Sequence, residues 1–136
     1  AAPAPFDRLP RPQHPDTLNT APLMSYGAKG EPEMWSFARA GVQRNVRAGK
    51  QVISNNGDFL YAMALIGEGI CVLPDFITAE GLQSGAVIEV LPDWSNPSLW
   101  LTLFYPPYER LPPVVGTFAD YFEAFIEDHP SLRVPL

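Results

Sequence analysis

The sequence predicts an α/β fold, and three observations support this prediction. Residues 51–74 (QVISNNGDFLYAMALIGEGICVLP) combine a short strand, a polar turn, a helix, a glycine-rich turn and an apolar strand. This order is typical of a Rossmann-like βαβ unit, in which a helix joins two parallel strands. Apolar or alternating runs at 23–26, 35–37 and 43–47 predict further strands. Apolar residues at helical spacing across 111–125 predict an amphipathic C-terminal helix.

The polar turn of the βαβ unit lies between a predicted strand and a predicted helix. The β-branched pair Val52 and Ile53 favours a strand that leads into this turn. Asn55 or Asn56 can cap the following helix, because an asparagine oxygen accepts a hydrogen bond from a free amide of the first helical turn. The apolar residues that this helix then carries are Phe59, Leu60, Met63, Ala64 and Ile66.

Two glycines predict where this helix ends. Gly67 and Gly69 can enter the left-handed conformation without a Cβ clash, so we expect them to stop the helix. The apolar run Ile70–Leu73, closed by Pro74, predicts a strand that is covered on both faces. In an open parallel sheet, the strand-to-helix turn of such a unit faces the ligand crevice.

Further elements are predicted after the βαβ unit. Asp75 can cap a helix that stops at Gly85. The alternation of Val87–Leu91 predicts a strand, and Trp94 in the following loop is expected to pack on the core. The almost wholly apolar run Leu99–Tyr105 predicts a strand buried on both faces.

A collinear set of residues resembles a known family. It consists mainly of GEGICVLPDF at 67–76 and GLQSGAVIEVLPDW at 81–94. The matching residues are Asn56, Leu60, Met63, Gly67, Gly69, Ile70, Leu73, Pro74, Asp75, Phe76, Gly81, Leu82, Gly85, Val87, Leu91 and Trp94. Together they resemble the effector-binding domain of LysR-type bacterial transcription regulators, and the resemblance extends over nearly the whole chain. Glu68 departs from the family, which more often has an apolar or uncharged residue between the two glycines.

The resemblance implies a periplasmic-binding-protein-like (type 2) architecture of two lobes. Residues 1–105 correspond to the second lobe. Residues 106–136 correspond to a return segment and a C-terminal helix that belong to the missing first lobe. The family pattern also places a helix-turn-helix and the first half of the sensor before Ala1, so the resemblance implies that this chain is a fragment.

The composition limits the classes of function. The chain has 136 residues, of which 46% are hydrophobic, and this suits one domain with a sizeable core. A formal net charge of -6 argues against a chain that itself grips a phosphate backbone, so DNA would be bound only through the missing N-terminal domain. The sequence shows no membrane span and no signal-peptide pattern, which predicts a cytoplasmic protein with no membrane partner. The single Cys71 is expected to be a small buried hydrophobe.

The sequence lacks the common motifs of catalysis, and we predict a protein that is not an enzyme. It contains no G-x-S-x-G, no H-E-x-x-H and no phosphate loop of the G-x-x-x-x-G-K type. His14 has no second histidine at metal-ligand spacing, so it is expected to be a solvated loop residue, and we predict no metal or cofactor. Paired carboxylates among Asp58, Asp75 and Glu80 are left open by the sequence.

The turn formed by Ser54, Asn55, Asn56 and Gly57 is the predicted effector site. Free amides at a helix start, with the aligned peptide dipoles, favour a carboxylate or another anion there. The family resemblance makes the loop after residues 23–26 the adjacent wall. The further candidates are therefore Ser25, Tyr26, Gly27 and Trp35. Two alternatives are open: the tryptophan either stacks on a flat ligand or belongs to the core, and the two asparagines either contact the ligand or only cap the helix.

The resulting functional prediction is the ligand-sensing part of a LysR-type regulator. Its small organic effector, expected to be a carboxylate, would modulate DNA binding by the absent helix-turn-helix. The alternative is a fragment of a type 2 solute-binding protein of a transport system, and a third possibility is an interaction module held together by the terminal helix. The apolar stripe of that helix predicts self-association, because its natural cover would be the missing lobe. The stripe consists of Leu111, Val115, Phe118, Phe122 and Phe125.

Overall fold

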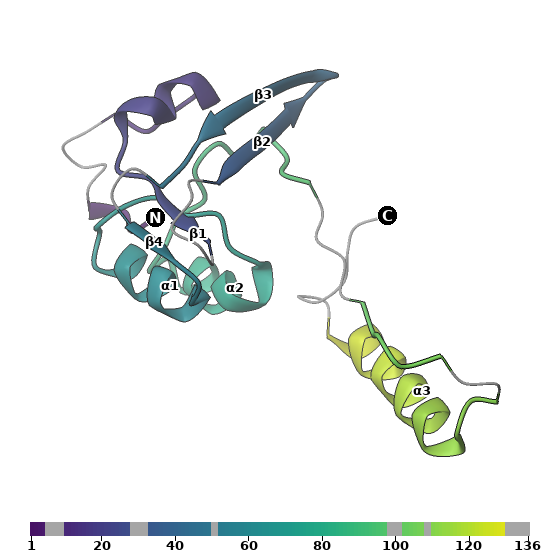
Figure 1. Cartoon of the computed structure of the whole chain (residues 1–136). Coiled ribbons are helices and arrows are strands. Elements are labelled where there is room, and N and C mark those ends of the chain that lie inside the picture. The colour runs from purple at the N-terminus through teal and green to yellow at the C-terminus, as the bar shows by residue number, and fades with distance from the viewer. Residues whose placement is uncertain (5–9, 28–32, 50–51, 98–101, 108–109, 130–136) are drawn as a thin grey trace. The chain divides into compact units, whose positions relative to one another are not determined.

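The computed structural model forms two units, Ala1–Pro97 and Ser98–Leu136, which we describe separately (Figure 1). The residues that it describes are 1–4, 10–27, 33–49, 52–97, 102–107 and 110–129. The first unit contains η2 (Pro15–Thr20), β1 (Met24–Tyr26), β2 (Met34–Arg39), β3 (Val42–Arg47), β4 (Val52–Ser54), α1 (Gly57–Leu65) and α2 (Asp75–Ser84). The second unit contains α3 (Pro113–Asp128). The predicted α/β class is confirmed.

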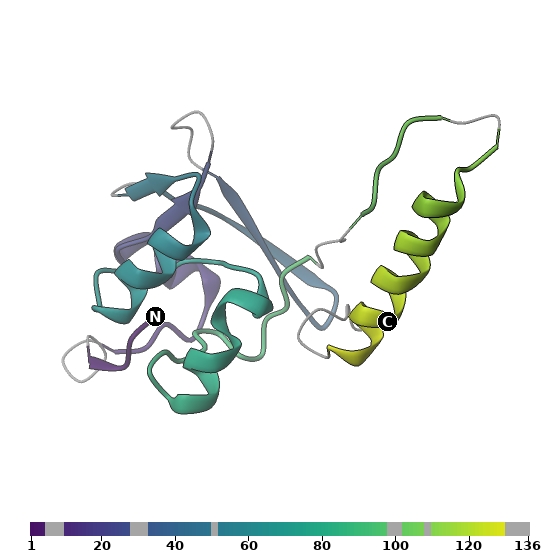
Figure 2. The same cartoon turned by 90° about the horizontal axis from the view of Figure 1, so that it is seen from below.

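Strands β1 and β4 form a parallel pair that positions the predicted effector turn. Met24 pairs with Val52, and Tyr26 pairs with Ser54 at the ends of both strands. On the opposite edge of β1, Leu23 forms a parallel bridge with Ile70. The chain that leaves β4 and passes through α1 therefore returns parallel to β1, as the βαβ pattern predicts. Helix α1 packs against both strands and against α2 (Figure 2).

The start of α1 follows the predicted capping chemistry. The side chain of Asn56 accepts a hydrogen bond of 3.0 Å from the amide of Phe59. The helix stops before Gly67, which has a φ of 86°. Gly69 has a different role from the one predicted: a Cβ built on it would lie 2.5 Å from the carbonyl oxygen of Pro22. Only glycine therefore allows the chain to approach β1 this closely.

Strands β2 and β3 form an antiparallel hairpin with a two-residue turn. Ala40 and Gly41 have φ values of 47° and 79°, which is the pattern of a type I′ turn. Trp35 and Phe37 lie on the same, buried face of β2, as their alternation predicts. They join a core cluster that also contains Leu18, Leu23, Val46, Ala48, Ile70, Leu91 and Trp94.

Three predicted strands are wrong in whole or in part. In Ile70–Leu73 only the first residue makes a strand-type bridge. Val87–Leu91 is irregular, because its amides bond to the end of α2 and to the N-terminus and because Leu91 has a φ of 65°. Leu99–Tyr105 lies partly outside the described residues, and its described part, 102–105, is irregular, with Phe104 89% exposed. These apolar runs would need partners along their edges to become strands.

The prediction for the start of α2 is also wrong in one detail. The N-cap position is Pro74, which provides no side-chain hydrogen bond, and Asp75 is the first helical residue. Its carboxylate still lies at the positive end of the helix dipole, where a negative charge is favourable. The predicted end is confirmed, since Gly85 adopts the left-handed conformation with a φ of 75°.

The second unit is built on α3, whose amphipathic pattern was predicted. No residue of this helix is buried. Its aromatic residues contact one another along the stripe, as in the stacked pair Phe118 and Phe122, with ring centroids 5.9 Å apart. Leu103, Phe104 and Tyr105 line a groove together with Val114, Val115 and Phe118. None of the helices in the described ranges has both the length and the apolar character that crossing a membrane requires.

Candidate functional site

The carboxyl ends of β1 and β4 meet at the predicted effector turn. The amide of Gly27 donates a hydrogen bond of 3.0 Å to the carbonyl oxygen of Ser54. This bond continues the parallel pairing one residue beyond Tyr26. Helix α1 starts three residues after Ser54, so its free amides lie at the same edge of the sheet. The structure thus brings together six of the eight predicted residues, namely Tyr26, Gly27, Ser54, Asn55, Asn56 and Gly57.

The polar side chains of this turn mainly shape the backbone. Ser54 Oγ accepts a hydrogen bond of 3.1 Å from the amide of Asn56, and the Asn56 oxygen is engaged by the helix cap. Asn55 and Asn56 are nevertheless exposed, and the Tyr26 side chain is 51% exposed. The turn therefore offers a ligand an exposed asparagine pair and an aromatic ring beside the positive end of α1.

Two further features of the helix start were not predicted: the close packing of Gly57 and the place of Asp58 beside the turn. Gly57 is packed closely, since a Cβ built on it would lie 2.9 Å from a methyl carbon of Ile77 in α2. Asp58 stands in the first turn of α1 and is exposed. Its carboxylate is stabilised by the helix dipole and competes with an anionic ligand for the same positive end. The sequence signal was present, because acidic residues are common in a first helical turn.

The two remaining predicted residues, Ser25 and Trp35, are buried. Ser25 has no exposed surface, and Trp35 is 3% exposed. Both contact Glu33, which sequence reasoning missed: the Trp35 indole N–H donates to Glu33 Oε2 at 3.2 Å, and Ser25 Oγ accepts from the Glu33 amide at 3.2 Å. This geometry favours a core role for Trp35 over stacking on a flat ligand. Nothing in the sequence pattern singles out the glutamate, because its partners come from tertiary packing.

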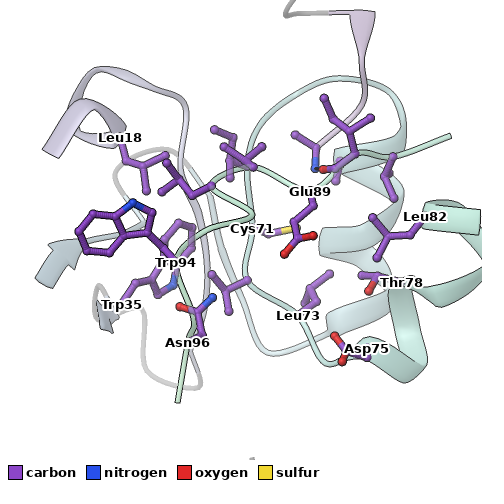
Figure 3. Close-up of a pocket in the computed structure, with 18 of the residues that line it drawn as sticks. Leu18, Trp35, Cys71, Leu73, Asp75, Thr78, Leu82, Glu89, Trp94 and Asn96 are labelled. Carbon is purple, nitrogen blue, oxygen red and sulfur yellow. Dashed lines mark hydrogen bonds between the residues drawn. The ribbon is translucent and has the colours of Figure 1, made fainter. Parts of the chain in front are cut away.

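A separate cavity of about 370 Å³ lies within the first unit (Figure 3). Its walls are mostly apolar and include Leu18, Leu73 and Trp94, with Asp75, Thr78, Glu89 and Asn96 as polar lining residues. Of the predicted site residues, only Trp35 lines it. The indole nitrogen of Trp94 is buried and has no hydrogen-bond partner among the described residues. We place the candidate site at the β1–β4 edge, because that edge carries the exposed side chains of Asn55 and Asn56 beside the start of α1.

Cys71 also lines this cavity and is half-buried, close to the prediction of a small buried hydrophobe. Burial raises the pKa of its thiol, and the nearby amino group of Ala1 opposes this shift. A raised pKa keeps the thiol protonated at neutral pH, so it is a poor nucleophile there.

The described ranges contain no group of three or more His, Cys, Asp or Glu side chains that could hold a metal ion. His14, predicted to be a solvated loop residue, has a side chain that is 41% exposed, and it also has a local structural role. Its Nδ1 accepts a hydrogen bond of 3.3 Å from the amide of Asp16 at the start of η2. Its ring lies edge-on to Trp94, with ring centroids 5.0 Å apart. The histidine thus holds the start of η2 against the core.

Comparison with known proteins decides the family. A family model described as the LysR substrate binding domain matches residues 1–131. The chain belongs to this family. It is thus the ligand-sensing type of domain of LysR regulators, as its sequence resemblance implied, and the solute-binding alternative is not favoured.

The similar curated proteins are transcription regulators. PtxR, an HTH-type transcriptional regulator of Pseudomonas aeruginosa, is 27% identical over 120 residues, which are 88% of this chain and 38% of PtxR. The uncharacterized HTH-type regulator YhjC of Escherichia coli is 29% identical over 132 residues, which are 95% of this chain and 44% of YhjC. This LysR domain therefore spans less than half the length of these relatives. Their names are those of regulators and not of enzymes.

Solved LysR-type structures show the same fold. The regulatory domain of AphB from Vibrio vulnificus matches with a TM-score of 0.68 and 23% identity, over 92% of this chain and 62% of that chain. The full-length virulence activator AphB of Vibrio cholerae matches with a TM-score of 0.64 and 22% identity, over 71% of this chain and 33% of that chain. At this identity the likeness shows the fold alone, an α/β fold of the type 2 periplasmic-binding-like kind.

Proposed function

We propose that this LysR domain senses a small organic anion at the edge where β1, β4 and the start of α1 meet. The contacts that we assign to the effector are made by residues at this edge, of which Tyr26, Asn55 and Asn56 are exposed and Gly27, Ser54 and Gly57 are half-buried. Ser25 and Trp35 have buried side chains and are not assigned a contact with the effector. Support for the proposal comes from one observation in particular: the Gly27–Ser54 hydrogen bond brings both strand ends to the exposed start of a helix.

The charge of the effector follows from the same geometry. The amides at the start of α1 favour a carboxylate, whereas Asp58 already supplies one negative charge to that helix turn. We therefore propose a monocarboxylate, because a second or third negative charge would be repelled by Asp58. The ring of Tyr26 is available to contact an apolar part of the same molecule.

In the whole protein, we propose that this domain is the second lobe of a two-lobed sensor. Residues 1–105 would form that lobe, and residues 106–136 would return to the first lobe. The effector would act by binding more tightly to one arrangement of the regulator than to another, since a ligand shifts an equilibrium only by its differential affinity. DNA would be bound by a helix-turn-helix outside this chain, in the cytoplasm, and α3 would contribute to self-association.

Calorimetric titration of the two-lobed protein tests the site. Benzoate, acetate and succinate should be compared with benzamide and acetamide, which keep the shape of the monocarboxylates and lack the charge. We expect heat of binding for a monocarboxylate and a weaker signal for the dicarboxylate and for the neutral amides. Equal binding of an acid and its amide would contradict an anion site at the helix start. An Asp58→Asn variant that failed to improve succinate binding would contradict the preference for a single charge.

A further inference from the structure

Glu33 makes more contacts across the first unit than its exposed position suggests. Its amide donates to Ser25 Oγ at 3.2 Å, and its carbonyl oxygen accepts from the amide of Ala48 at 2.8 Å. Its side-chain Oε2 accepts from the Trp35 indole N–H at 3.2 Å and lies 3.5 Å from Ser25 Oγ. One residue thus contacts β1, β2 and the chain after β3.

These contacts join the two sheets of the unit. Ser25 belongs to the β1–β4 pair, whereas Trp35 belongs to the β2–β3 hairpin. The junction is tight, because a Cβ built on Gly49 would lie 2.7 Å from the Cβ of Ser25. Gly49 also has a φ of 86°, so glycine is required there both for space and for conformation.

We propose that Glu33 is a positioning residue for the effector edge. Through Ser25, which immediately precedes Tyr26, it fixes the end of β1 and hence the amide of Gly27. The glutamate is assigned no contact with the effector: it acts through a buried serine and a buried indole. The effector part of this inference rests on the proposed function, whereas the positioning part concerns the chain by itself.

The contribution of the Glu33 side chain to fixing the end of β1 can be separated from that of the Glu33 backbone. The Glu33 amide and carbonyl bonds persist in any substitution that keeps the chain path. Glu33→Ala removes the acceptor of the indole N–H, whereas Glu33→Gln keeps an acceptor oxygen without the charge. Hydrogen bonds to a charged acceptor are stronger than neutral ones, so the glutamine variant should restore the parent behaviour in part. Glu68→Ala is the matched control, since that glutamate is exposed and has no recorded side-chain bond in the described chain.

The test is amide hydrogen exchange by NMR on the full chain, together with the chemical shift of the Trp35 indole N–H. For Glu33→Ala we expect exchange at Gly27 to rise by roughly tenfold, because the lost bond is one to a charged group. The amide of Phe59, which is held by the helix cap, should exchange as in the parent. Glu33→Gln should give an intermediate rate, and Glu68→Ala should give the parent rate.

Two results would overturn the proposal: Gly27 exchange in Glu33→Ala that matches Glu68→Ala, or exchange that rises equally at Gly27 and at Phe59. The first would mean that the Glu33 side chain does not fix the end of β1, and the second would mean that its loss only destabilises the whole unit. Titration of the two-lobed protein with benzoate tests the proposed effector site separately from the positioning role of Glu33. Absence of benzoate binding by the parent, with the exchange pattern as expected, removes the benzoate effector and leaves the positioning role intact.

Discussion

The amide of Gly27 and the carbonyl oxygen of Ser54 are joined by a hydrogen bond of 3.0 Å at the point where two parallel strands end. Because Tyr26 and Ser54 are paired in register, neither strand extends past the other. The chain then turns directly into α1, so the free amides of the helix lie beside the end of β1. The exposed side chains of Asn55 and Asn56 therefore lie beside the positive end of α1, where we propose that the effector binds.

Asn56→Ala should destabilise the first unit and weaken effector binding. The variant loses the acceptor for the amide of Phe59, and the loss of such a cap costs about 0.5 to 2 kcal/mol. Urea unfolding monitored by circular dichroism measures this cost. Asn55→Ala is the control, because Asn55 is exposed and makes no recorded side-chain hydrogen bond in the described part of the chain. Equal stability of the two variants would show that the cap contributes nothing.

Gly69→Ala should destabilise the first unit, because its Cβ would lie 2.5 Å from a backbone oxygen. We expect a cost of about 1 to 3 kcal/mol, the range for forced overpacking. Gly116→Ala in α3 is the opposite case, since the nearest atom would be 3.8 Å away. It should stabilise the helix by about 0.5 to 1 kcal/mol. Thermal unfolding of both variants tests these two predictions. A change in melting temperature of the same sign in both variants would contradict them.

Stability should fall as the pH rises above the ordinary pKa of a thiol, 9.0, because burial raises the pKa of Cys71 in the folded chain. In that range the unfolded chain loses the thiol proton while the folded chain retains it, so ionisation favours the unfolded state. Below pH 9.0 this contribution to stability is fully present. Urea unfolding at about pH 8 and about pH 10 measures the fall. A fall of the same size in Cys71→Ala would assign it to other groups.

The chain should self-associate through α3. Its stripe leaves Phe118 52% exposed and Phe125 38% exposed, and burial of such aromatic surface favours association. Phe118→Glu should shift the mass measured by light scattering toward the monomer without loss of helix in the circular dichroism spectrum. Asp120→Asn is the control on the polar side of the same helix. A parent chain that is monomeric at high concentration would disprove the prediction.

Local chemistry explains what the sequence could predict. The cap by Asn56, the stop before Gly67 and the left-handed Gly85 each depend on a few neighbouring residues, and all three are observed. The alternation of Trp35 and Phe37 likewise predicted a strand with one buried face, because the hairpin partner follows directly in sequence.

Features that depend on distant partners were missed. Val87–Leu91 has the alternating pattern of a strand, yet its amides bond to Gly81 and Ala1. The alternation of apolar residues along a sequence does not indicate which distant groups will be its hydrogen-bond partners. The same holds for the candidate site. Its turn could be predicted from capping chemistry, whereas the burial of Ser25 and its contact with Glu33 result from two sheets meeting.

The hairpin turn at Ala40 and Gly41 is a suitable place for substitution and labelling. Ala40 adopts a φ of 47°, which an alanine tolerates poorly and an asparagine tolerates well. Replacement of Ala40 by asparagine should therefore stabilise the hairpin. The turn is distant in sequence from both residues 54–57 and α3. A dye attached there after replacement of Ala40 by cysteine, in a Cys71→Ala background, would report on the environment of the hairpin without modifying the β1–β4 edge.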